Sequence, residues 1–136
     1  MKLKVSFIGS GYMATEHAKA FQDCKDFELT SVYSKTSSNA KKFFKKFKLK
    51  NTNSSIADIY HKNKPDLVII SVTETELTKI LKEVFKFKWV ILVEKPCGIN
   101  LKDSTNIKKL IKLNKPKIFI SLNRRFYSSS IFLKKK

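Results

Sequence analysis

Glycine is rare in this chain and is concentrated in one turn near the N-terminus. Only three of the 136 residues are glycine, and two of them, Gly9 and Gly11, lie two positions apart. They belong to a G-x-G-x-x-A pattern, Gly9-Ser10-Gly11-Tyr12-Met13-Ala14. Between a strand and a helix such a pattern binds a diphosphate, because Gly11 leaves the backbone open and the N–H groups of the helix N-terminus face the phosphates. The pattern predicts a dinucleotide-binding turn; the alternative is an ordinary turn that holds two glycines.

A second candidate group stands about twenty residues beyond the glycine turn, where NAD-preferring domains carry an acid for the ribose 2′-hydroxyl. The residues there, Ser34-Lys35-Thr36, contain no acid. Ser34 and Thr36 can donate hydrogen bonds to a 2′-phosphate, and Lys35 offers an opposite charge. The group therefore favours NADP over NAD as the cofactor, although Lys35 could also be an ordinary surface lysine in so lysine-rich a chain.

A third group, Glu94-Lys95-Pro96, directly follows an apolar run at residues 89–93. A continuous apolar run of this length is typical of a strand that is buried on both faces of a parallel sheet. Ligands bind beyond the carboxyl ends of the strands in open α/β sheets. The position of this group therefore makes it a candidate for contact with a ligand.

Strands and helices alternate along the chain and must position these groups. Alternating and β-branched apolar runs predict strands over residues 2–8, 27–33, 67–70, 89–93 and 117–122. Apolar residues at helical spacing predict helices between them, with a short helix at 56–60 and a loop or one short strand within 48–55. Repeated βαβ units with right-handed crossovers give a parallel sheet. The predicted fold class is α/β, a Rossmann-type doubly wound parallel sheet.

Polar residues mark where two of these helices begin. Ser37 or Ser38 is expected to cap one helix, and Asn100 with Asp103 gives a cap-like start to another. The positions expected to be buried in these two helices are Ala40, Phe43, Phe44, Phe47, Ile107, Leu110 and Ile111. Both helices would therefore cover the sheet with an apolar face.

The formal net charge of +18 at pH 7 would suit a nucleic-acid binder. The 29 basic residues are lysines apart from Arg124 and Arg125, however, and they are spread over every segment. Residues that read bases or fork onto phosphates are preferentially arginines, because the guanidinium is planar and bidentate. We interpret the charge as solvated surface and do not expect a nucleic-acid partner; a basic nucleic-acid-binding protein is the least favoured alternative.

Composition also argues against several other classes of protein. The two cysteines, Cys24 and Cys97, cannot form a disulfide framework and are expected to be reduced and structural. His17 and His61 are single histidines without a nearby carboxylate or cysteine cluster, so no metal site is expected. No apolar run approaches the roughly 18 residues of a membrane span, and no signal-peptide core follows the N-terminus. We expect a cytoplasmic protein with no membrane partner.

The order of the motifs gives the chain a resemblance to a known family. The glycine turn, Ser34-Lys35-Thr36, Glu94-Lys95-Pro96 and Asn123-Arg124-Arg125-Phe126 each follow a predicted strand. In this order and at this spacing, over residues 3–130, they resemble the Gfo/Idh/MocA oxidoreductases, the family of glucose-fructose oxidoreductase and inositol dehydrogenase. The resemblance implies that the chain is the N-terminal NAD(P)-binding domain of such an enzyme.

The resemblance also implies a role for each matching residue. The glycine turn would hold the diphosphate, the group around Lys35 the adenosine ribose, and Glu94 the nicotinamide ribose. The residues implied to bind the cofactor are Gly9, Ser10, Gly11, Tyr12, Met13, Ala14, Ser34, Lys35, Thr36, Ser71, Thr73, Glu94, Lys95, Asn123 and Arg124. Lys95 would be the catalytic residue, orienting the substrate and assisting proton transfer as a hydride moves to or from the nicotinamide. The Lys95–Pro96 bond would be cis, as it often is in the family.

Two departures from the family pattern change what is expected. Many members have Thr-Pro and then a histidine after the fourth strand, whereas this chain has Thr73-Glu74 and then Thr78, so some cofactor contacts should differ. Family members are also much longer, and their second α/β domain supplies the substrate pocket, an Asp/His pair and the usual oligomer interface. We therefore expect residues 1–122 to form the NAD(P)-binding domain and residues 123–136 to begin the segment that leads to a second domain, absent from this truncated sequence.

Two functions share this fold and this site. The first is the NAD(P)-binding part of an oxidoreductase that acts on a small carbohydrate only when a second domain is supplied. The alternative is a truncated, non-catalytic dinucleotide-binding module. They differ in whether a carboxylate–histidine pair reaches Lys95, and we expect none from this chain, because His17 lies in the helix on the diphosphate side and His61 precedes the fourth strand.

The expected absence of a second domain would have a further physical consequence. Four apolar residues that it would cover should be exposed, namely Phe126, Tyr127, Ile131 and Phe132. Because an apolar patch of this kind favours association, we expect a homodimer or an aggregation-prone monomer.

Overall fold

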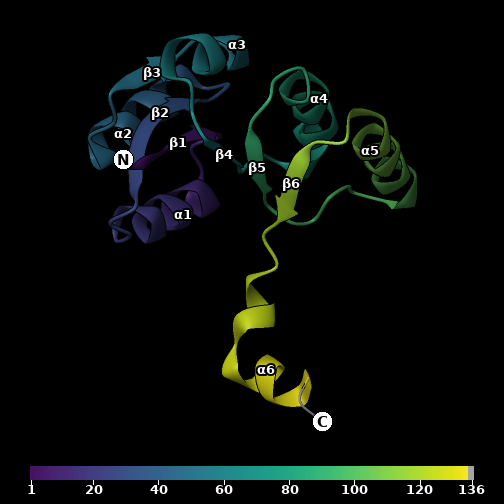
Figure 1. The fold of residues 1–136 in the computed structure, drawn as a ribbon. Coiled ribbons are helices and arrows are strands. Elements are labelled where there is room, and N and C mark those ends of the chain that lie inside the picture. Colours follow the sequence, from purple (N-terminus) through teal and green to yellow (C-terminus); the bar gives the residue numbers. More distant parts are fainter. Residues whose placement is uncertain (135–136) are drawn as a thin grey trace.

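The computed structural model describes residues 1–134, and within them six strands form one sheet in the order β3-β2-β1-β4-β5-β6 (Figure 1). The strands are β1 (Leu3–Ile8), β2 (Phe27–Tyr33), β3 (Asn51–Asn53), β4 (Leu67–Ile70), β5 (Val90–Val93) and β6 (Lys117–Ile120). All neighbouring strands are parallel. The predicted Rossmann-type α/β fold is confirmed, and the uncertain segment at 48–55 contains the short strand β3.

Helical segments connect the strands and extend beyond the last one. They are α1 (Tyr12–Gln22), α2 (Ser37–Phe47), α3 (Ile56–Asp58), the π-helical turn η1 (Ile59–Asn63), α4 (Glu74–Val84), α5 (Leu101–Asn114), the 3₁₀ turn η2 (Asn123–Phe126) and α6 (Ser128–Lys134). The helix expected at 56–60 therefore continues as a π turn to Asn63. The last strand ends at Ile120, two residues earlier than expected, where Leu122 N donates to the Ile120 carbonyl and turns the chain.

Helices cover the sheet on both faces, and alternate residues of each strand point to opposite faces. In β4, Val68 and Ile70 pack with residues of α3, η1, α4 and α5. Ile69, between them, packs with residues of α1 and α2. All three side chains are fully buried. The central strands are therefore rigid supports for the residues that follow their carboxyl ends.

The starts of the helices agree with expectation only in part. Neither Ser37 nor Ser38 caps α2. Its N-cap is Thr36, whose carbonyl oxygen accepts hydrogen bonds from Asn39 N and Ala40 N, so the helix begins one residue early. Asn100 caps α5 as predicted, because its side chain accepts a 2.9 Å hydrogen bond from Asp103 N. Three expected core residues are only half-buried, namely Phe44, Leu110 and Ile111. Leu110 and Ile111 belong to α5, in which Ile107 is the one buried residue.

The C-terminal segment extends away from the sheet, so that α6 packs on η2 and not on the sheet (Figure 1). The four apolar residues expected to be exposed are so: Phe126 (74%), Tyr127 (53%), Ile131 (44%) and Phe132 (61%). Of the predicted segment 123–136, residues 135–136 lie outside the described part of the chain. Within the described residues, no helix has the length and apolarity that a membrane crossing requires.

Candidate functional site

The residues that follow the central strands form one hydrogen-bonded row at the carboxyl edge of the sheet. The bonds that extend the ladder beyond the strands are Gly9 N to Tyr33 O (2.8 Å), Ser71 N to Ile8 O (2.9 Å), Glu94 N to Ile70 O (2.9 Å) and Ser121 N to Val93 O (2.9 Å). Gly9, Ser71 and Glu94 are therefore held side by side, although they are far apart in the sequence. The sheet brings the predicted site segments together at the edge where ligands bind in this kind of fold.

The two glycines of the turn meet different structural requirements. Gly9 has a φ of +101°, and a Cβ at this position would overlap the carbonyl oxygen of Ser71. Gly11 is the N-cap of α1 in an extended conformation, and a Cβ there would meet nothing within 4 Å. Ala14 is fully buried where α1 packs on the sheet. Gly9 is therefore required by the fold itself, whereas the space beside Gly11 is open, as the close approach of a diphosphate to the helix N-terminus requires.

A cavity of about 450 Å³ opens along this row and is named here the carboxyl-edge cavity. The predicted site residues that line it are Gly9, Ser10, Gly11, Ser34, Lys35, Ser71 and Thr73. The Oγ atom of Ser71 is buried and has no hydrogen-bond partner within residues 1–134. A buried hydroxyl without a partner is unfavourable, and an oxygen of a bound ligand would satisfy it. The cavity, the open space at Gly11 and this hydroxyl together fit a dinucleotide.

The other eight predicted site residues lie outside the cavity lining, among them Tyr12, Met13 and Thr36. Tyr12 and Met13 belong to the first turn of α1, and their side chains are 76% and 37% exposed. Their backbone N–H groups nevertheless belong to the end of the helix that faces the glycine turn. Thr36 is exposed and its carbonyl begins α2. Any contact of these three residues with a ligand would therefore use the backbone or a side chain at the rim.

Sequence reasoning missed Glu76, which also lines the carboxyl-edge cavity. Its Oε1 atom lies 3.2 Å from Nζ of Lys35, and the two side chains are 36% and 81% exposed. Glu76 stands in the first turn of α4, after β4. The dinucleotide-binding pattern places its acid at the end of the second strand, so this pattern does not point to Glu76. The only sequence signal was an acidic first turn in the helix that follows the fourth strand.

A histidine and a carboxylate meet at the end of β5. His17 Nε2 lies 2.7 Å from Oε1 of Glu94, and the two side chains are 14% and 9% exposed. The expectation that His17 has no carboxylate nearby is therefore wrong in three dimensions. The reason is that the early turns of α1 lie beside the carboxyl ends of the central strands, so a helix assigned to the diphosphate side also reaches the end of β5. The pair directly adjoins Lys95 in the chain.

Lys95 shares a second, smaller hollow with the residues after β6. This hollow has a volume of about 300 Å³ and is lined by Lys95, Ser121, Leu122, Asn123, Arg124 and Arg125. Lys95 is exposed, and within residues 1–134 its Nζ makes no hydrogen bond or ion pair. The Lys95–Pro96 bond is cis, as the resemblance implied. The structure thus groups Lys95 with Asn123 and Arg124, separately from the carboxyl-edge cavity.

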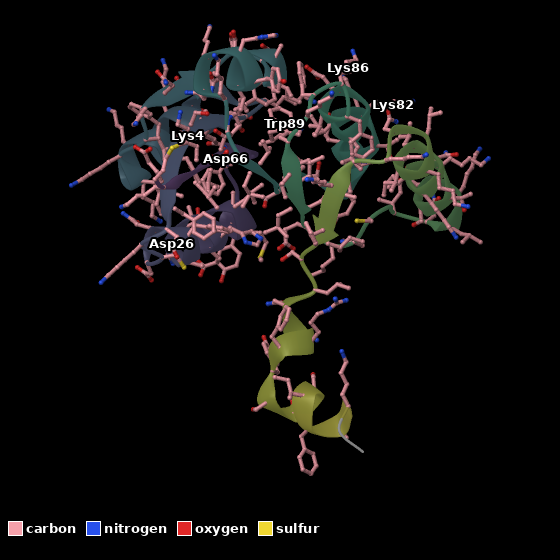
Figure 2. All side chains as sticks on the ribbon, in the orientation of Figure 1. Lys4, Asp26, Asp66, Lys82, Lys86 and Trp89 are labelled. Atoms are coloured by element: carbon pink, nitrogen blue, oxygen red, sulfur yellow. The ribbon has the colours of Figure 1, made fainter. Side chains whose placement is uncertain are left out.

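A larger cavity, about 650 Å³, lies elsewhere and is lined by Asp66, Trp89 and lysines at the amino ends of β5 and β6. Figure 2 shows Trp89 and Lys86 on the side of the molecule opposite to the departing C-terminal segment. Trp89 is 7% exposed and donates a hydrogen bond to the Val84 carbonyl, so its ring serves the core. All predicted site residues lie outside this cavity, and its size does not make it the functional site.

Comparison with known proteins agrees with the geometry. A model of the Gfo/Idh/MocA family, described as an oxidoreductase family with an NAD-binding Rossmann fold, matches residues 3–121. The chain belongs to this family. The six strands of its sheet lie within the matched residues and form the NAD-binding Rossmann fold of this family.

One relative and several solved structures match almost the whole chain. Glucose-6-phosphate 3-dehydrogenase of Bacillus subtilis (strain 168) is 29% identical over 131 residues, which are 96% of this chain and 37% of that protein. The WlbA dehydrogenase of Chromobacterium violaceum, solved with NADH and UDP-GlcNAcA, has a TM-score of 0.86 at 19% identity and covers 98% of this chain and 39% of its own. Biliverdin reductase of Synechocystis sp. PCC 6803, solved with biliverdin and NADP+, has a TM-score of 0.78 at 16% identity, covering 98% and 42%. The 136 residues thus span about two fifths of the length of these relatives.

Proposed function

We propose that this domain binds a nicotinamide dinucleotide along the carboxyl edge of its sheet and prefers NADPH to NADH. The observation that carries the proposal is the carboxyl-edge cavity, which joins the open N-terminus of α1 to Lys35 at the end of β2. The diphosphate would meet the N–H groups beside Gly11, with Ser71 Oγ as a further partner. Lys35, with Ser34, would meet the 2′-phosphate of NADPH.

The other end of the cofactor would lie toward Glu94 and Lys95. When bound there, the nicotinamide would supply a hydride donor or acceptor for a hydroxyl or carbonyl group of a carbohydrate. Glu94, fixed by His17 at 2.7 Å, would accept a hydrogen bond from the adjacent ribose. The exposed Nζ of Lys95 would orient the substrate oxygen and hold or pass its proton. Asn123 and Arg124, which share the hollow with Lys95, would border the same region.

The substrate class rests on relatives. Glucose-6-phosphate 3-dehydrogenase and the UDP-GlcNAcA complex of WlbA both carry a carbohydrate in their names. Because this chain spans only 37% and 39% of those proteins, we infer that residues 1–136 hold the cofactor and that carbohydrate turnover needs further protein. A panel of sugars and polyols added to the 136-residue chain with NADP+ or NADPH should give no absorbance change at 340 nm beyond the buffer control; steady turnover would contradict this inference.

Cofactor binding is tested by titrating the purified chain with NADPH and with NADH while following nicotinamide fluorescence at low and at moderate salt. We expect saturable binding that is tighter for NADPH and weaker in Lys35→Asp, with a loss of affinity as salt screens the phosphate contact. The exposed Lys109→Asp on α5 changes charge by the same amount away from the carboxyl-edge cavity and serves as the control. Failure of both nucleotides to bind would refute the proposal.

A further inference from the structure

The charges around the carboxyl-edge cavity are balanced, unlike those of the chain as a whole. The charged residues in its lining are two lysines, Lys35 and Lys79, and two glutamates, Glu76 and Glu83. The complete sequence has 29 basic and 11 acidic residues. Acidic groups are therefore concentrated at this cavity, and they stand where a ligand with a diphosphate is proposed to bind. The overall composition of the chain does not explain why acidic residues are placed here.

Glu76 stands closest to the proposed position of the adenosine ribose. Its Oε1 lies 3.2 Å from Lys35 Nζ, and this pair joins the first turn of α4 to the end of β2. The backbone N–H of Glu76 donates a 3.0 Å hydrogen bond to the Thr73 carbonyl, so the backbone of this residue is fixed in the first turn of the helix. At 36% exposure the carboxylate is only partly open to water. A group that meets the Lys35 ammonium from inside the cavity therefore also meets the Glu76 carboxylate.

The two charges act in opposite directions on the 2′ position of a nucleotide. A carboxylate accepts the hydrogen bond that a ribose 2′-hydroxyl donates, and it repels a 2′-phosphate. An ammonium group attracts the phosphate. We propose, on the basis of the dinucleotide binding proposed above, that Glu76 determines how far this domain discriminates between NADPH and NADH. Lys35 draws the preference toward NADPH, and Glu76 limits that preference and keeps NADH an acceptable ligand.

Stabilisation of α4 is the competing explanation for an acid at this position. Carboxylates in the first turn of a helix interact favourably with its dipole whether or not a ligand is present. Glu74 lies in the same turn, is exposed and does not line the cavity. Glu74→Gln therefore removes the same helix interaction as Glu76→Gln but leaves the charge of the cavity unchanged. This makes Glu74→Gln a matched control for the role of Glu76 in binding.

The experiment measures the dissociation constants of NADPH and NADH for the wild-type chain, Glu76→Gln, Glu74→Gln and Lys35→Gln in one low-salt buffer. In Glu76→Gln we expect the ratio of NADH to NADPH dissociation constants to rise about three- to tenfold, as loss of one partly screened charge predicts. The ratio should fall in Lys35→Gln and stay at the wild-type value in Glu74→Gln. Glu76→Lys, which reverses the charge, should raise it further. Because the ratio is internal to each variant, partial unfolding lowers both affinities equally and does not imitate the effect.

The outcomes separate this inference from the proposal on which it rests. If the wild-type chain binds neither nucleotide, dinucleotide binding is refuted and the role of Glu76 with it. If the wild-type chain binds, but the ratio in Glu76→Gln and Glu76→Lys equals that in Glu74→Gln, only the role of Glu76 is overturned. A fall in the ratio in Glu76→Gln would overturn it as well, because the sign of the charge effect would then be wrong.

Discussion

His17 Nε2 and Glu94 Oε1 lie 2.7 Å apart, so that a side chain from the second turn of α1 contacts the residue directly after β5. The two residues are 77 positions apart in the sequence, and their side chains are 14% and 9% exposed. The contact joins α1 to the carboxyl edge of the sheet at Glu94, which directly precedes Lys95 in the chain. It therefore links the packing of the domain to the end of the site where chemistry is proposed.

The stability of the domain should depend on this pair. His17→Ala or Glu94→Ala leaves the partner buried without its hydrogen bond, so each should lower the free energy of unfolding by about 1–3 kcal/mol. The double variant should lose less than the sum of the two, and urea unfolding of all four proteins measures the difference. Lys19→Ala and Glu16→Ala, from an exposed pair on the same helix, should each change it by less than about 1 kcal/mol. Strictly additive losses for His17 and Glu94 would show that the contact contributes nothing.

Substitution of the two glycines of the turn should affect different properties: Gly9→Ala the stability of the fold, and Gly11→Ala the binding of the cofactor. Gly9→Ala places a side chain against the Ser71 carbonyl in a left-handed conformation, so it should lower the free energy of unfolding by more than about 1 kcal/mol. Gly11→Ala meets no atom within 4 Å and should leave that free energy within about 0.5 kcal/mol of the wild-type value. The same methyl group would occupy space needed by the diphosphate and should weaken NADPH binding about tenfold, equal to about 1.4 kcal/mol. Urea melts and nucleotide titrations of both variants check this; unaffected binding in Gly11→Ala would contradict it.

The two cysteines should differ in reactivity, and the difference should depend on pH. Burial raises the pKa of the Cys97 thiol above its usual range, whereas Cys24 is exposed. Because the thiolate is the nucleophile, a raised pKa lowers its fraction near neutral pH, and the rate at Cys97 should continue to rise at a pH where that of an ordinary thiol levels off. Thiol titration of Cys24→Ser and Cys97→Ser between pH 7 and about 10 measures each site alone. Equal rates at both sites at pH 7 would contradict this account.

The exposed C-terminal side chains should cause association. Phe126 and Ile131 are 74% and 44% exposed, and exposed apolar side chains grouped in this way favour contact between molecules. Light scattering should show a dimer or larger species for the wild-type chain, and the double variant Phe126→Ser with Ile131→Ser should shift it toward monomer. Leu101→Ser, at an 85% exposed position at the start of α5, should have no such effect. A wild-type monomer at high concentration would rule out this prediction.

The sequence was sufficient for the fold because its signals are local. The apolar run at residues 67–70 and the glycine turn each specify one element from a few adjacent residues, and strands alternating with helices leave few topologies. The contacts Lys35–Glu76 and His17–Glu94 join residues 41 and 77 positions apart. They depend on the strand register and on how each helix is rotated about its axis, which no local pattern encodes. The N-cap of α2 was also not predictable from side-chain types, because Thr36 occupies that position without making a side-chain hydrogen bond.

The two edges of the sheet differ in a way that affects how molecules could join. At one edge, β3 is three residues long and consists of Asn51, Thr52 and Asn53, so it offers little to a further strand. At the other edge, β6 exposes Phe119 at 62% and Ile120 at 42%, and only Lys117 at its start supplies a charge within the strand. A further strand could therefore pair with the sheet at the β6 edge but hardly at the β3 edge. If β6 of one molecule paired with β6 of another, the exposed apolar edge of both sheets would be occupied. Assembly would then stop at two copies rather than continue into a fibre.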